Sequence, residues 1–239
     1  MSSFRDLLDR HAVTSWDKQE SLFRLMGGEH DWRIDLASGI LILTNSKGEH
    51  HLPIQWLGTA DREENTWIWA WANEQLDVPE PLREAALALR RHGEEHGVSE
   101  LVDPERDLKE VNGDLMALAA SGLCKADGYY LCEMDHGAEY FLFKSDEVRA
   151  MGESGPVRCM NVFLSILSHV DLNHRVALVY FLEAKGYDCL EDGPKVTASS
   201  AAGKIFATFD ELGRITEIRT EVGSTANGAT APVRPEVDR

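Results

Sequence analysis

The first part of the chain carries a pattern of apolar positions that is typical of an amphipathic helix. Between residues 3 and 26, apolar side chains recur at intervals of about three and four, which places them on one helix face. A pair of glycines follows directly, and glycine readily adopts the left-handed backbone conformation that ends a helix. The pattern therefore predicts a helix over residues 3–26, with a break near Thr14.

The hydrophobic pattern changes to an extended period after this helix. Apolar and polar side chains alternate, and turns that contain Gly, Asn or Asp separate the runs. These runs predict four strands, over residues 32–36, 40–44, 50–58 and 66–72. Because short turns join successive strands, we expect an antiparallel meander.

The rest of the chain combines helical patterns with hairpin-linked strands. Helices are expected over residues 81–96, 103–121, 157–170 and 173–185, and strands over 128–134, 139–144, 187–191, 195–199, 204–209 and 214–221. Because the strands do not alternate with helices, the predicted class is α+β, with a largely antiparallel β-sheet packed with several α-helices. We expect a single domain over residues 1–222, with two lobes near 1–98 and 99–222 as an open alternative, and a disordered tail over 223–239.

The charge balance narrows the choice of partner. The 239 residues include 24 Lys and Arg against 41 Asp and Glu, so the formal net charge is −17. Binding to nucleic acid or to an anionic membrane depends on Lys and Arg, so neither partner is expected. A protein or a small molecule remains as partner. Since the acidic residues recur at expected hairpin tips, they fit a solvated surface as well as a site for a basic protein.

Cysteine spacing and the first residues bear on location. The four cysteines are widely spaced and form no C-x-x-C pair, which is typical of reduced thiols. The first residues are charged throughout, unlike a signal peptide, and no apolar run reaches the roughly 18 residues that a membrane span needs. We therefore expect a cytoplasmic protein.

A strand rich in tryptophan is the most unusual local feature. Alternation over residues 67–73 places three indole rings and one Asn on the same face, and all six tryptophans lie within the first 71 residues. One interpretation is an aromatic sheet face that binds a ligand or a partner, and the other is a core strand covered by helices. The candidate binding residues are Trp56, Trp67, Trp69, Trp71, Asn73 and Gln55.

A second candidate site lies near the end of the helix expected over 81–96. His92, Glu95 and His96 fit the pattern H-x-x-E-H, in which two His on one helix face bind zinc beside a general base. Both His residues also continue the apolar stripe of that helix, and no third ligand is evident. Packing or surface histidines therefore explain the pattern at least as well, and the metal site is the alternative.

Two sequence elements resemble a known family. Pro53–Thr59 ends in Leu-Gly-Thr, and Thr66–Asn73 reads Thr-Trp-Ile-Trp-Ala-Trp-Ala-Asn. Together they resemble a family of bacterial proteins classed as a domain of unknown function, and the segments 93–101 and 209–214 extend the resemblance over most of the chain. The resemblance implies a recurring domain and carries no activity.

Three well-known catalytic and nucleotide-binding motifs are absent from the sequence, which limits the classes of function to consider. The chain has no G-x-G-x-x-G, G-x-x-x-x-G-K-[ST] or G-x-S-x-G motif, so the usual nucleotide-binding and serine-hydrolase readings lose support. We expect a non-catalytic protein that binds a ligand or another protein through the Trp-rich sheet face and the acidic surface, without a cofactor. The alternative is a metal-assisted hydrolase, with zinc at the H-x-x-E-H segment.

Overall fold

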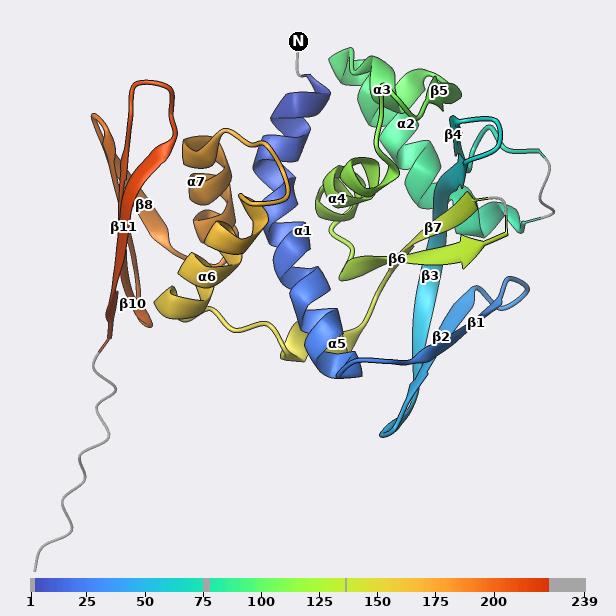
Figure 1. Cartoon of the computed structure of the whole chain (residues 1–239), viewed down its shortest axis with the longest axis horizontal. Helices are drawn as coiled ribbons and strands as arrows, with labels where there is room; N and C mark the ends of the chain where they lie inside the picture. Colours follow the sequence, from blue (N-terminus) through green and yellow to red (C-terminus); the bar gives the residue numbers. More distant parts are fainter. Residues whose placement is uncertain (1–2, 75–77, 136, 224–239) are drawn as a thin grey trace, which may run out of the picture.

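One long helix lies between two layers that each contain an antiparallel sheet (Figure 1). The computed structural model describes residues 3–74, 78–135 and 137–223. The expected tail, apart from Gly223, lies outside the described residues. Within the described ranges, no helix is long and apolar enough to cross a membrane. The α+β class predicted from the sequence is confirmed.

The central helix α1 spans Phe4–Met26 and continues through Thr14, so the expected break is wrong. Its first turn is stabilised by a capping box, in which Ser3 and Asp6 each bond the other's backbone N–H. Gly27 ends the helix with a φ of 72°, as the glycine pair predicts. The helix packs against α4 on one side and α7 on the other.

The larger sheet has seven strands in the described part of the chain. These are β1 Asp31–Asp35, β2 Ile40–Asn45, β3 Gly48–Asp61, β4 Thr66–Trp69, β5 Glu105–Asp107, β6 Gly128–Met134 and β7 Gly137–Phe143. The order is β1-β2-β3-β4-β5, and β7 pairs with β3 and β6. Strand β3 is the centre of the sheet, because β2 pairs with its first half, β4 with its second half and β7 with residues 54–61.

Short helical segments flank the larger sheet. They are the 3-10 helix η1 Glu80–Arg83, α2 Glu84–His96, α3 Ser99–Val102, α4 Gly113–Leu123 and α5 Asp146–Ala150. Helix α4 packs between α1 and the sheet (Figure 1). Two apolar clusters pack on the sheet: a cluster on the helix side that includes residues of α4, and a cluster on the pocket side that also includes the end of α1, Leu82 of η1 and Ala86 of α2.

The smaller sheet contains β8 Asp188–Asp192, β9 Lys195–Ser200, β10 Gly203–Phe209 and β11 Ile215–Val222, in the order β11-β10-β9-β8. Helices α6 Pro156–Ile166 and α7 His174–Ala184 lie between it and α1 (Figure 1). The four strands match the strands expected from the sequence within about two residues. Residue 98 does not separate the two sheets, because β3 pairs with β7 across this position.

Several predicted elements have other bounds in the structure: the helix expected over 157–170 ends at Ile166, and the strand expected over 50–58 extends over Gly48–Asp61. The Trp-rich strand ends at Trp69 instead of residue 72, and the following residues form a turn in which Ala72 N–H donates to the Trp69 carbonyl. The helix expected from Asp103 begins only at Gly113, because Glu105–Asp107 pairs with β4. Asn112 caps the observed helix, because its side chain accepts hydrogen bonds from the backbone N–H groups of Asp114 and Leu115.

Candidate functional site

An apolar pocket of about 380 Å³ lies between β1 and strands β3, β6 and β7. Its lining residues are Trp32, Ile34, Leu36, Trp56, Val78, Met134, Glu139 and Phe141. Among these described residues, Glu139 is the one ionisable side chain. Apolar walls with few polar groups, at this volume, are typical of small-molecule sites.

The β1–β2 hairpin supplies one wall because its apolar residues share a face. Trp32 lies opposite Leu43, and Ile34 lies opposite Leu41. Both leucines are fully buried, so this face of the hairpin packs on the apolar cluster beneath it. Arg33, between the two wall residues, points to the exposed side.

A β-bulge shapes the opposite wall. The pairing of β3 with β7 shifts by one residue between Trp56 and Gly58. Residues three apart on a regular strand point to opposite faces, but the extra residue, Leu57, brings Trp56 and Thr59 to the same face. Leu57 packs in the cluster on the helix side, whereas Trp56 belongs to the cluster on the pocket side. Both Trp56 and Thr59 consequently reach Glu139.

Hydrogen bonds from three polar side chains converge on the Glu139 carboxylate, two of them direct and one through Thr59. The Trp56 indole N–H donates to Oε2 at 2.7 Å, and the Thr59 hydroxyl lies 3.0 Å from Oε1 and 2.9 Å from Oε2. The Asn73 amide donates to the Thr59 hydroxyl at 3.1 Å. Because that hydroxyl accepts from Asn73, its own proton is directed to Glu139.

Burial changes the acidity of this carboxylate. It raises the pKa of Glu139 to about 6, and the hydrogen bonds from Thr59 and Trp56 oppose the rise. None of the described Lys, Arg or His side chains forms an ion pair with Glu139. The group is therefore a partly buried carboxylate that ionises near neutral pH, without an ion-pair partner in the described part of the chain.

Cys132 of β6 lies opposite Glu139 in the sheet. Burial raises the pKa of this thiol to about 12, and the neighbouring carboxylate adds to the rise. A thiol with such a pKa stays protonated at neutral pH and is a poor nucleophile. The pocket consequently holds an anion but no activated nucleophile among the described residues.

Two of the predicted tryptophans pack in the core. Trp67 and Trp69 are fully buried in the cluster on the helix side, with ring centroids 5.4 Å apart in an edge-to-face contact. The Trp69 indole N–H donates to the Glu100 carbonyl at 3.0 Å. Neither ring lines the apolar pocket, and the core interpretation describes both of them.

Trp71 and Asn73 lie beyond the end of β4 and have separate roles. Trp71 is half-buried, and the Arg90 guanidinium lies 4.5 Å from the centroid of its ring. Asn73 is buried and contacts the carboxylate network through Thr59. Of this predicted pair, only Asn73 is connected to the pocket by the hydrogen bonds described above.

Gln55 connects strand β3 to the start of α2. Its Oε1 accepts a hydrogen bond from the Ala85 backbone N–H at 3.0 Å, and its Nε2 donates to the Pro81 carbonyl at 3.0 Å. The Ala85 N–H is among the first-turn donors of α2, which lack partners within the helix itself, and the Pro81 carbonyl belongs to η1 directly before this helix. Gln55 therefore fixes this helix on the sheet and is not among the residues that line the pocket.

The histidine pair on α2 has a stacked geometry. The His92 and His96 rings lie 4.1 Å apart at an angle of 20°, and His96 Nδ1 is 2.9 Å from the His92 carbonyl oxygen. Burial, together with the nearby His96, lowers the pKa of His92. Glu95 is exposed. Within the described ranges, no group of three His, Cys, Asp or Glu residues could hold a metal ion. The zinc site at this segment stays an untested prediction.

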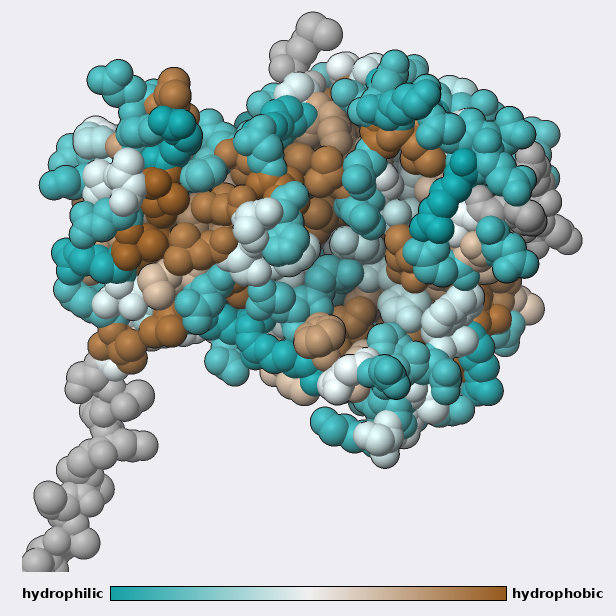
Figure 2. Space-filling model, viewed as in Figure 1, coloured by the Kyte–Doolittle hydropathy of each residue, from teal (hydrophilic) through white to brown (hydrophobic). Residues whose placement is uncertain are grey.

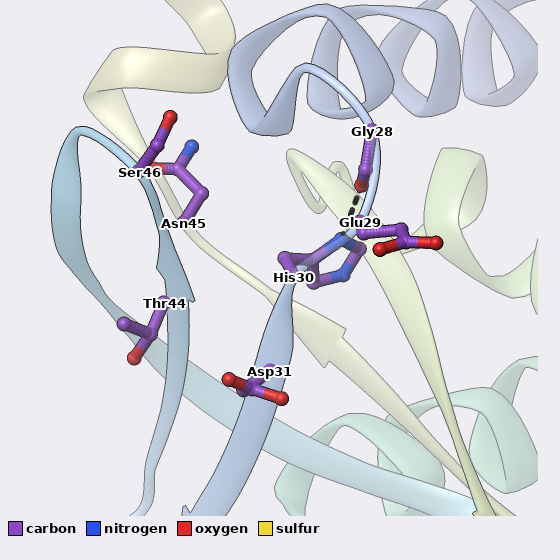
Figure 3. Close-up of a pocket in the computed structure, with 7 residues that line it drawn as sticks. All are labelled: Gly28, Glu29, His30, Asp31, Thr44, Asn45 and Ser46. Carbon is purple, nitrogen blue, oxygen red and sulfur yellow. Dashed lines mark hydrogen bonds between the residues drawn. The ribbon is translucent and has the colours of Figure 1, made fainter.

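A larger and more open hollow of about 790 Å³ lies where α1 meets the first hairpin (Figure 3). It is lined by Gly28, Glu29, His30, Asp31, Thr44, Asn45 and Ser46, and their side chains spread around it rather than converge. His30 bonds the Gly28 carbonyl and the Tyr130 hydroxyl, at 2.9 and 3.0 Å. Asn45 donates to the Met26 carbonyl at the end of α1. These polar groups serve the local fold, so this hollow is the weaker candidate.

The sequence reasoning missed Glu139, although a signal for it exists. Glu139 is the one charged residue in β7, and alternation places it on the same face as Phe141 and Phe143. A lone charge on an apolar strand face is unusual and indicates a buried role. Its pairing with Thr59 depends on a bulge and on a contact 80 residues away, which the local pattern does not show.

Comparison with curated proteins and with solved structures found no match. A family model matches residues 5–146, a segment that contains α1 apart from Phe4, the larger sheet and the described residues that line the apolar pocket. The chain therefore belongs to DUF6882, a family of unknown function.

Proposed function

We propose that the chain is a non-catalytic binding protein that holds a small, largely apolar molecule in the pocket between β1 and the larger sheet. The observation that carries this proposal is a single, partly buried carboxylate among the described residues of an otherwise apolar pocket of about 380 Å³. Apolar walls supply affinity by burial, and one fixed polar group orients the ligand.

The chemistry of the pocket favours binding over catalysis. General acid–base catalysis by a carboxylate usually needs a second group that binds or activates the reacting atoms. Glu139 is the one ionisable lining residue, and the adjacent Cys132 thiol stays protonated. The metal-assisted hydrolase remains the alternative, and elemental analysis of the purified protein for zinc tests it.

Two further expectations belong with this proposal. A protein partner would find apolar side chains beside α6 and α7, where Figure 2 shows them gathered, and α6 leaves Val157 and Leu164 partly exposed. The pocket offers a more specific set of binding groups than this surface beside α6 and α7.

The four cysteines are all free thiols, which agrees with the cytoplasmic location that we propose.

Blocking the pocket tests the proposal. Ile34→Trp adds a ring on the half-buried pocket wall, whereas Arg33→Trp adds the same ring on the exposed side of the same strand. Binding of 2-phenylethanol and 2-phenylethylamine is followed by saturation-transfer NMR and calorimetry. We expect binding by the wild type and by Arg33→Trp, and its loss in Ile34→Trp. Equal binding by both variants, or no binding by the wild type, would contradict the proposal.

A further inference from the structure

The Glu139 carboxylate lacks a neutralising cation in the described part of the chain. Its two donors, the Trp56 indole and the Thr59 hydroxyl, are both uncharged. The Arg83 guanidinium lies over the Trp56 ring, 5.5 Å from its centroid, but Arg83 is not among the lining residues. Burial of an ionised carboxylate without a cation is costly, so a ligand that brings a positive charge would gain from offsetting that cost.

The carboxylate also keeps room for further hydrogen bonds. Two carboxylate oxygens offer about four acceptor positions, and the donors among the described residues, Trp56 and Thr59, use two of them. Glu139 lines the pocket, so a ligand that occupies the pocket meets the carboxylate. A protonated amine carries both features that the site lacks, a positive charge and N–H donors.

Other ligand classes fit this pocket less well. Carboxylates and phosphates would meet a like charge, with no basic residue among the described lining residues to bind them. A metal ion needs several ligand groups, and the lining supplies a single carboxylate. A quaternary ammonium ion brings charge without N–H donors, so it would leave the open acceptor positions unused.

The rest of the pocket and the whole-molecule charge agree with an amine ligand. Trp32, Trp56 and Phe141 offer aromatic surfaces for an apolar ligand body. The formal net charge of −17 creates a field that raises the local concentration of small cations. The acidic surface thus acquires a role in attracting the ligand, besides solubility.

We propose that the ligand of this pocket is a small organic amine, whose ammonium group binds the Glu139 carboxylate and whose apolar body packs between Trp32, Ile34, Trp56 and Phe141. This inference rests on the proposed function, since it names the ligand class of the same pocket. Glu139 acts as the group that selects the charge, and the aromatic and aliphatic walls select the size and shape of the body.

A matched pair of probes tests the ligand class. The compounds 2-phenylethylamine and 2-phenylethanol share a ring and a two-carbon chain, and they differ in the ammonium and hydroxyl groups. Calorimetry at about pH 7.5 compares wild type, Glu139→Gln and the control Glu133→Gln. Glu133 lies on neighbouring β6, is exposed and pairs with Arg62 at the surface. In Glu139→Gln the new amide keeps an oxygen that can accept from Trp56 or Thr59.

We expect the wild type and Glu133→Gln to bind the amine on the order of tenfold or more tightly than the alcohol, as a charge-assisted hydrogen bond predicts. In Glu139→Gln the preference should fall close to one while alcohol binding remains. Equal binding of both compounds by the wild type would overturn the amine inference and leave the binding pocket standing. A preserved preference in Glu139→Gln would also overturn it, whereas no binding of either compound would contradict the proposed function itself.

Discussion

Replacing Glu139 with Gln should remove a pH dependence from the stability of the protein. The pKa of Glu139 rises from an ordinary 4.5 to about 6 on folding. Below the lower value both the folded and the unfolded chain are protonated, and the group has no effect. Between the two values the unfolded chain ionises first, so the free energy of unfolding falls as pH rises, and above the higher value the full penalty is present.

The size of this penalty follows from the shift. A tenfold change in an ionisation constant corresponds to about 1.4 kcal/mol, so the rise of the Glu139 pKa from 4.5 to about 6 lowers the free energy of unfolding by about 2 kcal/mol at neutral pH. The neutral amide of Gln avoids the ionisation and still accepts a hydrogen bond from Trp56 or Thr59. The variant should therefore be about 1–2 kcal/mol more stable than the wild type above the pKa of Glu139, although we expect it to lose the preference for amines.

Urea unfolding followed by tryptophan fluorescence measures this effect between about pH 4 and about pH 7.5. The difference in unfolding free energy between Glu139→Gln and the wild type should grow by about 2 kcal/mol over this range. Glu133→Gln is the control, and its difference from the wild type should change little, because its side chain is 59% exposed. A flat difference for Glu139→Gln, or one that grows toward low pH, would refute the reasoning.

Two further substitutions test the polar contacts of the fold. Asp17→Asn should lower the free energy of unfolding by about 3–5 kcal/mol, because Arg158 and Lys185 both pair with this buried carboxylate and would lose their anion; a loss below about 1 kcal/mol in urea unfolding would contradict a buried network. Thr59→Val should destabilise the protein by about 1–2 kcal/mol and raise the pKa of Glu139 further, since it removes a hydrogen bond to the carboxylate. NMR titration of the Glu139 carboxyl measures the second effect, and an unchanged or lower pKa would count against the assigned contact.

The smaller sheet could be predicted well because its signals are local. Its strands follow one another in hairpins, and the turns at Asp192-Gly193 and Asp210–Gly213 carry residues that favour tight turns. Each strand pairs with its neighbour in sequence, so no long-range contact had to be known. The α+β class followed from the same hairpin-linked order of elements.

The pocket could not be predicted because its geometry depends on contacts between distant segments. The Trp-rich run contains no Gly or Pro after Trp69 that would signal the end of the strand. The core residues Trp67 and Trp69 are of the same type as the pocket residue Trp56. Only the pairing of β3 with β4 and β7 decides which face of the sheet each ring occupies. The bulge that brings Thr59 beside Glu139 is likewise a property of the paired sheet, not of either strand alone.

The indole N–H signals of the tryptophans test the central claim most directly. Trp56 donates to the Glu139 carboxylate, whereas Trp69 donates to the Glu100 carbonyl on the other side of the sheet, so Trp69 is an internal control. ¹H–¹⁵N NMR spectra, assigned with a Trp56→Phe variant, are recorded as 2-phenylethylamine is added. Our account predicts a saturable shift of the Trp56 signal with little change at Trp69. Amine binding that leaves the Trp56 signal in place would contradict it.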